Sequence, residues 1–113
     1  MIITHTSCNT THSYEVVEKI PAGFFVWNIG RNAPAGYIAI AEQGDEEYTI
    51  NPDTLKAIKL NDDEITKLDN AASYGITNLE KAKKAIASKR SGRMADRKRV
   101  VALAVIEIFE RIS

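Results

Sequence analysis

The sequence predicts an α+β fold in which a short antiparallel β-meander in the N-terminal half packs against two or three C-terminal helices. Before about residue 60, apolar residues occur in short runs rich in β-branched and aromatic side chains, separated by turn-forming residues. After that point, apolar residues recur at helical spacing behind helix-capping residues. With 113 residues, 44% of them hydrophobic, the chain fits one domain with its own core.

The first strand of the predicted meander begins near residue 14. Residues 1–12 show no sustained period, and we expect a flexible end or an edge strand there, ahead of a single domain over residues 13–113. From Tyr14 to Ile20 apolar and polar residues alternate, as in a half-buried strand. Pro21–Gly23 then supplies a turn.

Two further strands are predicted on either side of a loop. Residues 24–29 are apolar on both faces, which is typical of a central strand covered from both sides. Residues 37–41 return as a third strand after a loop over residues 30–36. Because connections this short join neighbouring antiparallel strands, a meander is the simplest topology.

Residues 51–60 allow two interpretations. Tyr48–Ile50 is predicted as a fourth strand, and the next four residues are Asn-Pro-Asp-Thr. They either turn a hairpin into a strand over residues 55–60, or they start a short helix capped by Asn51 with Pro52 at its first position. The hairpin is preferred, because the short strand before it needs a partner.

The C-terminal half is predicted to form helices at residues 62–74, 78–90 and 94–112. Asn61 and Glu64 have the spacing of a capping box. Gly75 is placed to end the first helix, and Ile76 follows it where a hydrophobic contact is usual. Thr77–Glu80 is predicted to be a second capping box, so two helices should meet at a tight corner.

The last helix begins with cations and then becomes the most apolar run of the chain. On a helical wheel of about 100° per residue, one broad face collects Val101, Ala102, Val105, Ile106, Ile108, Phe109 and Ile112. Lys98 projects onto the same side, so either its ammonium group reaches back to water or the buried part of the helix begins after it. Because the apolar face is wider than thin strands cover, a homodimer through this helix is also predicted.

Cations are concentrated in one segment of a chain whose net charge is zero. Residues 78–99 contain nine Lys or Arg and two acidic residues, and such a field attracts polyanions. The sequence therefore predicts a small non-enzymatic binding or regulatory protein whose basic helical face, residues 81–99, engages nucleic acid or a nucleoprotein through phosphate contacts. The predicted binding residues are Lys81, Lys84, Lys89, Arg90, Arg93, Arg97 and Arg99.

An alternative function uses a different surface. The protein would then be a protein-interaction module or inhibitor that acts through an acidic turn and an aromatic loop, because exposed loops often carry function. The basic face would only be solvated. The residues predicted for this partner surface are Trp27, Arg31, Asn32, Tyr37, Asp45, Glu46 and Glu47.

The sequence predicts no catalytic, metal or cofactor site. His5, Cys8 and His12 could offer three zinc ligands, but a structural zinc site usually needs four, and no second His or Cys cluster exists in the sequence. The sequence also lacks a glycine loop of the kind that binds phosphates next to a helix. A single cysteine, no signal-peptide pattern and no apolar run of about 18 residues together predict a cytoplasmic protein that does not enter a membrane.

Overall fold

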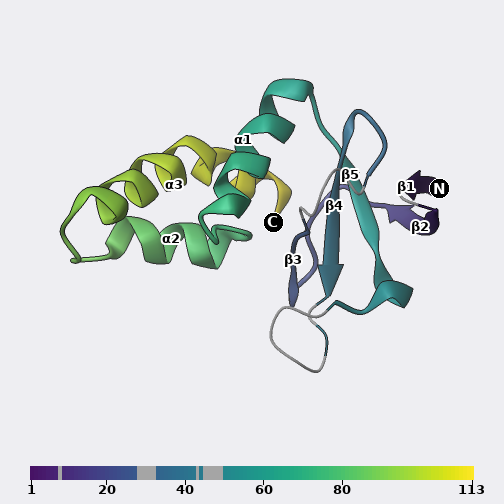
Figure 1. The fold of residues 1–113 in the computed structure, drawn as a ribbon, viewed down its shortest axis with the longest axis horizontal. Helices are drawn as coiled ribbons and strands as arrows, with labels where there is room; N and C mark the ends of the chain where they lie inside the picture. Colours follow the sequence, from purple (N-terminus) through teal and green to yellow (C-terminus); the bar gives the residue numbers. More distant parts are fainter. Residues whose placement is uncertain (8, 28–32, 43, 45–49) are drawn as a thin grey trace.

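The computed structural model describes residues 1–7, 9–27, 33–42, 44 and 50–113. These residues form a five-stranded sheet followed by three α-helices (Figure 1), so the predicted α+β class is confirmed. The strands are β1 (Ile2–Ser7), β2 (Thr10–Val16), β3 (Phe24–Val26), β4 (Tyr37–Glu42) and β5 (Lys56–Lys59). A one-turn 3-10 helix, η1 (Pro52–Thr54), precedes β5, and the α-helices are α1 (Asp62–Ser73), α2 (Leu79–Ala87) and α3 (Arg93–Ile112).

The strands do not follow one another across the sheet, whose order is β1-β2-β5-β4-β3. The pairs β1/β2 and β3/β4 are antiparallel neighbours, as in a meander. Between them lies β5, antiparallel to β4 and parallel to β2. This strand suits a central position because Ala57 and Ile58 belong to the apolar clusters on opposite faces and both are buried. The sheet is therefore mostly antiparallel and departs from a simple meander at β5.

Residues 24–29 were predicted to form a central strand, and the described part of this run, residues 24–27, lies at the edge of the sheet. In β3, Phe24 and Val26 belong to the larger apolar cluster, while Phe25 packs against the smaller one, so side chains cover both faces. The outer edge is covered differently. The Val26 N–H donates to the Thr77 carbonyl at 2.8 Å, at the corner between α1 and α2. A helix corner thus replaces the neighbouring strand that a central position requires.

Residues 51–60 combine parts of both interpretations. Asn51 caps η1, because its side-chain oxygen accepts from the Asp53 N–H at 3.1 Å. The strand that follows pairs with β4 and β2, so the preferred hairpin with the preceding residues is wrong. The Asn51 N–H donates to the Glu42 carbonyl at 3.1 Å, which brings the chain back beside the end of β4. Of the predicted strand Tyr48–Ile50, the first two residues lie outside the described part of the chain.

The first helix begins and ends where its capping residues predict. Asn61 and Glu64 form the capping box reciprocally, with N–H to side-chain oxygen distances of 2.8 and 3.3 Å. At the other end Gly75 adopts φ +79°, a left-handed conformation that favours glycine. The N–H of Ile76 bonds the Ala71 carbonyl, and the Ile76 side chain is buried. Both predictions for this helix are confirmed.

The second capping box is wrong by one residue. Asn78 caps α2 by accepting from the Lys81 N–H at 2.9 Å. Thr77 stands before the cap, and its buried hydroxyl has no hydrogen-bond partner among the described residues. At its other end α2 stops at Ala87 rather than residue 90, because Ser88 adopts an extended backbone.

The core is divided between the two faces of the sheet. The larger apolar cluster joins one face to the helices, with Leu68 and Ala71 from α1 and Ala82 from α2. The predicted apolar side of α3 supplies the centre of this cluster: its buried residues are Ala102, Val105, Ile108, Phe109 and Ile112. Five of the seven residues predicted for this side are therefore covered within one chain, and Val101 and Ile106 are partly buried. Among the described residues, no helix has the length and apolar character that crossing a membrane requires.

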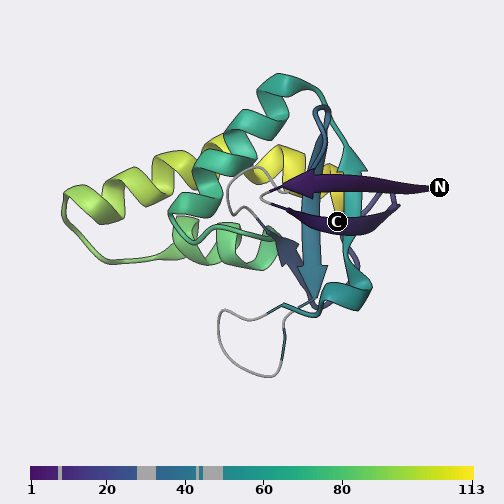
Figure 2. The same ribbon diagram turned by 45° about the vertical axis from the view of Figure 1, so that its right-hand side comes forward.

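The β1–β2 hairpin folds over the other face of the sheet (Figure 2). Tyr14 of β2 is fully buried there, and the His12 ring stands 5.6 Å from the Trp27 ring in an edge-to-face arrangement. His12 lies on β2 and Trp27 directly follows β3, and the strands β5 and β4 lie between β2 and β3 in the sheet. The sheet is therefore strongly curled, and the hairpin covers the face that the helices leave open.

Candidate nucleic-acid interface

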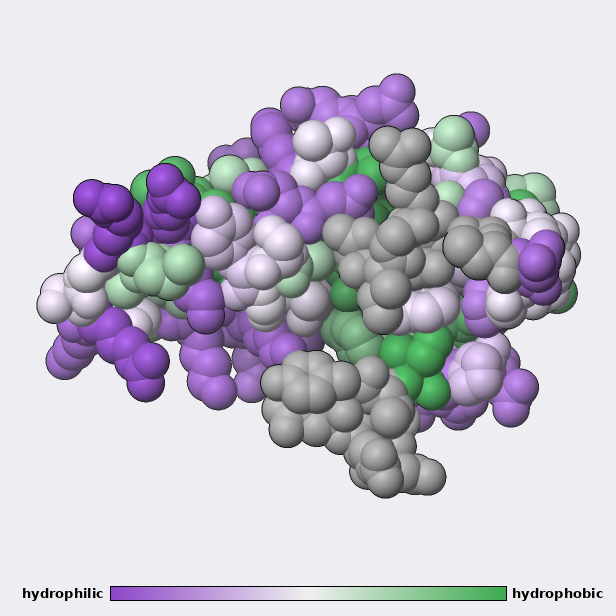
Figure 3. All heavy atoms as spheres, in the orientation of Figure 1, coloured by the Kyte–Doolittle hydropathy of each residue, from purple (hydrophilic) through white to green (hydrophobic). Residues whose placement is uncertain are grey.

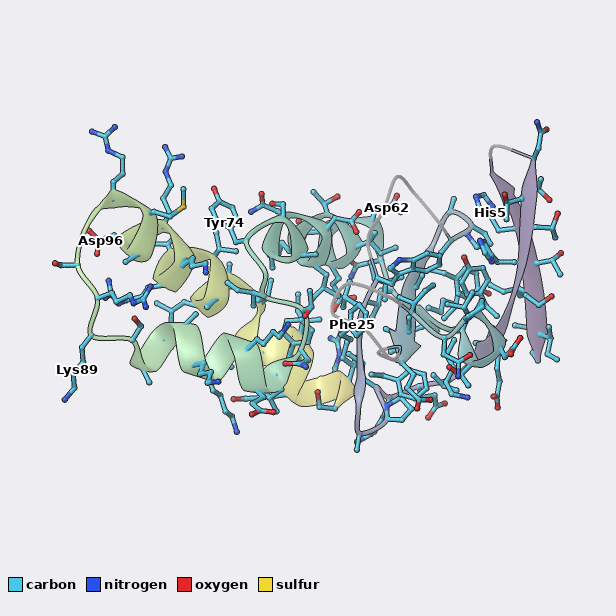
Figure 4. The ribbon with its side chains drawn as sticks, turned by 60° about the horizontal axis from the view of Figure 1, so that its bottom comes forward. His5, Phe25, Asp62, Tyr74, Lys89 and Asp96 are labelled. Carbon is cyan, nitrogen blue, oxygen red and sulfur yellow. The ribbon has the colours of Figure 1, made fainter. Side chains whose placement is uncertain are left out.

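The helices α2 and α3 form an antiparallel pair that extends away from the sheet (Figure 1). We call residues 79–99 the helical arm. It reaches beyond the end of α1, and it gives the molecule a long dimension of 42 Å against 31 and 26 Å in the other directions. Figure 4 shows Lys89 and Asp96 at the free end of the arm, with His5 at the opposite end of the molecule.

The connection between α2 and α3 is held by Arg99, one of the predicted binding residues. Its Nε and Nη2 donate to the Ser88 carbonyl at 3.2 and 3.0 Å, and Nη2 also donates to the Arg90 carbonyl. Its Nη1 pairs with Asp96 at 2.7 Å. Arg99 thus satisfies carbonyl groups that follow the end of α2 and neutralises an acidic residue of the arm. Its guanidinium group is engaged within the fold.

The other cations of the arm are exposed and unpaired. None of them makes an ion pair within the described part of the chain. They are Lys81, Lys83, Lys84, Lys89, Arg90, Arg93, Arg97 and Lys98. Figure 3 shows hydrophilic residues gathered at the end of the arm. Of the two acidic residues in the arm, Asp96 is already paired with Arg99, so only Glu80 is left to offset the repulsion among these cations. This repulsion makes an anionic ligand favourable.

An open groove of about 700 Å³ runs along the arm between α2 and α3. Its cations come from both helices and from their connection: Lys81 and Lys84, Arg90, and Lys98. Ser88 and Ser91 also line it. The remaining lining is mostly apolar: Tyr74, Gly75, Ile76, Ala85, Met94 and Ala95. The groove therefore offers positive charge around an apolar wall.

The groove exists because α1 ends before the arm does. Lys98 lies on the side of α3 that becomes buried farther along, but α1 ends at Ser73 and does not cover this part of the helix. The Lys98 side chain is exposed and reaches the groove. The burial of α3 begins after it, with Ala102 as the first fully buried residue. Of the two alternatives for Lys98, the later start of the buried segment is observed.

A second depression of about 640 Å³ lies beside the first. Arg93 and Arg97 line it, together with Val100 and Val101. Tyr74 lines both hollows, and Figure 4 shows it where α1 meets the arm. An aromatic ring in this position was missed by sequence reasoning, because only the packing of α1 against α3 brings it to the arm.

The predicted cations are therefore distributed over several places. Lys81, Lys84 and Arg90 share the groove. Arg93 and Arg97 share the neighbouring depression, while Lys89 stands at the end of the arm. Met94 and Lys98, which were not among the predicted binding residues, also line the groove. The signal for Lys98 was present in the sequence as a cation on the apolar side of the wheel.

The alternative partner surface is only partly described. Trp27 and Tyr37 are half-buried and pack against the smaller apolar cluster of the sheet. The remaining predicted residues, Arg31, Asn32, Asp45, Glu46 and Glu47, lie outside the described residues.

The two histidines are brought together by the first hairpin. His5 and His12 are directly opposite each other on β1 and β2, whereas Cys8 lies outside the described residues. The His12 ring also packs edge-on against the rings of Trp27 and Tyr14. Among the described residues, no group of three His, Cys, Asp or Glu side chains is close enough to hold a metal ion.

The carboxyl groups whose pKa is lowered, those of Glu15 and Glu64, lie outside the helical arm. The ammonium group of Lys56 donates to Glu15 at 2.6 Å and lowers the pKa of that carboxyl, and the pair joins β2 to β5. A hydrogen bond from Arg111 likewise lowers the pKa of Glu64, joining α3 to α1. Burial raises the pKa of Tyr14. The Glu15–Lys56 and Glu64–Arg111 pairs thus connect elements of the fold.

Comparison with known proteins found no matching family model, no matching curated protein and no matching solved structure. The fold and the site together define a small α+β domain that carries a protruding basic helical arm.

Proposed function

We propose that the protein binds nucleic acid through the helical arm, with the phosphate backbone following the groove between α2 and α3. The observation that carries the proposal is a set of unpaired, exposed cations around an open groove at the protruding end of the molecule. Phosphate contacts by Lys and Arg supply most of the affinity of such interfaces and carry little sequence information. The protein is then a non-enzymatic binding protein.

The residues that line the groove favour a single-stranded nucleic acid over a duplex. Lys81 and Lys84 lie one helical turn apart, since residues three or four apart face the same side of a helix. Lys98 on the neighbouring helix also lines the groove, so that cations border it on both helices. Tyr74 provides an aromatic ring beside these cations, and an unpaired base can stack on such a ring. A duplex keeps its bases stacked inside and gains only the phosphate contacts.

The test compares matched lysine variants by fluorescence anisotropy with labelled single-stranded and duplex oligonucleotides at several salt concentrations. The groove variant is Lys81→Ala, Lys84→Ala and Lys98→Ala, and the control is Lys19→Ala, Lys59→Ala and Lys67→Ala. Both variants lose three positive charges, but the control lysines lie outside the helical arm. We expect the groove variant to bind at least about tenfold more weakly, and its salt slope on a single strand to fall by about 0.7 for each lost phosphate contact.

Two results would contradict the proposal. One is no binding by the unmodified protein at low salt. The other is an equal loss of affinity in the groove variant and the control, which would mean that net charge, and not the groove, governs binding.

A further inference from the structure

The side of α3 that faces away from the core carries an ordered pattern of its own. We call it the outer face of α3. Its middle is apolar, with Val100 and Leu103 exposed by 67% and 59% and Ala104 exposed beside them. Large apolar side chains this exposed on one helix face are unexplained by the fold, because the opposite side of α3 supplies the core.

The charges on the outer face are separated by sign. Arg93 and Arg97 precede the apolar middle, and Glu107 and Glu110 follow it. All four are exposed, and within the described residues none of the four makes an ion pair. The other charges on this face differ: Asp96 is paired with Arg99, and Arg111 with Glu64. The free charges are thus basic at one end and acidic at the other.

Such a pattern is complementary to itself when two copies of the helix run in opposite directions. Arg97 and Glu107 each stand five residues from Ala102, or about 7.5 Å along the helix at about 1.5 Å per residue. In an antiparallel pair centred there, Arg97 of each copy lies near Glu107 of the other, and Val100 and Leu103 meet across the seam. A parallel pair would instead place like charges together.

We propose that the outer face of α3 is a homodimer interface in which two α3 helices pack antiparallel about a two-fold axis. The two copies use the same patch, as two-fold symmetric dimers do. This interface is distinct from the apolar side of α3, which each chain covers for itself. It also leaves the groove open, because Lys98 lies on the inner side of the helix.

The dimer should be weak and sensitive to salt. A helix of 20 residues is about 30 Å long, and one face of it buries less than the roughly 800 Å² per partner of a standard interface. The ion pairs at the ends are exposed, so they set the orientation more than they add affinity. We therefore expect a concentration-dependent mixture of monomer and dimer.

The test is a charge swap read by sedimentation velocity over a concentration series. One variant carries Arg93→Glu and Arg97→Glu, and the other carries Glu107→Arg and Glu110→Arg. Each variant alone brings like charges together in the antiparallel pair, so its dimer should weaken at least about tenfold. An equimolar mixture should recover the dimer, because one variant is then acidic at both ends and the other basic at both ends. All four side chains are exposed, and circular dichroism checks that both variants are folded.

The apolar middle is tested separately by Leu103→Glu, which should abolish the dimer of an otherwise unchanged chain. The proposal is overturned if the unmodified protein stays monomeric at every concentration, or if it dimerises and neither the charge variants nor Leu103→Glu weaken that dimer. In the second case a different face joins the copies. Neither result bears on nucleic-acid binding, whose test changes lysines on the inner side of the arm.

Discussion

Ion pairs connect elements of the fold outside the helical arm, whereas the cations of the arm other than Arg99 have no ion-pair partner among the described residues. In the body, Glu15 pairs with Lys56, and Glu64 pairs with Arg111, and each pair joins two elements. In the arm, Arg99 and Asp96 form an ion pair, while eight exposed cations have no partner among the described residues. The two ion pairs therefore support the fold, whereas the unpaired cations of the arm repel one another, a repulsion that the proposed anionic ligand would offset.

The largest expected difference between body and arm is in packing. Phe109→Ala removes a fully buried ring from the centre of the core and should lower the free energy of unfolding by about 3–5 kcal/mol. Met94→Ala, in an exposed position of the same helix, should change it by less than about 0.5 kcal/mol. Urea denaturation measures both. Similar losses in the two variants would mean that Met94 contributes to stability as much as a core residue does.

Arg99 is the exception to the rule that arm cations are free. Arg99→Ala leaves the Ser88 and Arg90 carbonyls without their donor and Asp96 without its partner. We expect a loss of about 1.5–3 kcal/mol in unfolding free energy, the usual range for hydrogen bonds to a charged group. Arg97→Ala is the matched control and should stay within about 0.5 kcal/mol. If thermal unfolding finds the two variants equally stable, the connection is not held by Arg99.

Substitution of Tyr74 tests whether the groove distinguishes a single strand from a duplex. Tyr74→Leu keeps an apolar side chain beside α3 but removes the ring, so binding to a single strand should weaken by about 1–3 kcal/mol for each stacked base. Binding to a duplex should change little, and Tyr74→Phe should behave as the unmodified protein. Equal effects on the two nucleic acids would show that the ring only supports the fold. Anisotropy titrations with both oligonucleotides measure the difference.

The smallest expected effect concerns pH and the pairs of the body. Arg111 lowers the pKa of Glu64 in the folded state, so this pair stabilises the protein above the ordinary glutamate pKa of about 4.3. The stabilisation is lost as pH falls through the lowered folded pKa. Glu64→Gln keeps an oxygen for the capping box and removes the charge. Near neutral pH it should cost about 0.2–1 kcal/mol.

That difference should disappear as the pH is lowered, when chemical denaturation is repeated along a pH series. A difference that stays constant with pH would assign the effect to packing and not to the charge of Glu64.

Local chemistry accounts for the features that the sequence predicted well. Asn61 and Gly75 define the ends of α1 through hydrogen bonds to residues only a few positions away. The buried side of α3 follows from the helical period of its own residues. The cations of the site were likewise visible, because their density needs no knowledge of the fold.

The remaining features depend on contacts between distant residues. The position of β5 between β2 and β4 is set by pairings with strands far away in the chain, and several orders are compatible with the same apolar runs. Arg99 was predicted to contact phosphate, but its guanidinium group instead donates to the carbonyl of Ser88, eleven residues away. Tyr74 reaches the groove because α1 ends against the arm. No periodicity in the sequence carries this information.

The bonds made by Arg99 also affect the entropy of binding. Because the backbone carbonyls of Ser88 and Arg90 are already held, the connection between α2 and α3 is ordered before any ligand arrives. The proposed binding would then restrict mainly the rotamers of the contacting Lys and Arg side chains, at about 0.5–1.5 kcal/mol for each one that is immobilised. The arm is in this sense preorganised: the proposed ligand would meet a backbone that has no further folding to complete.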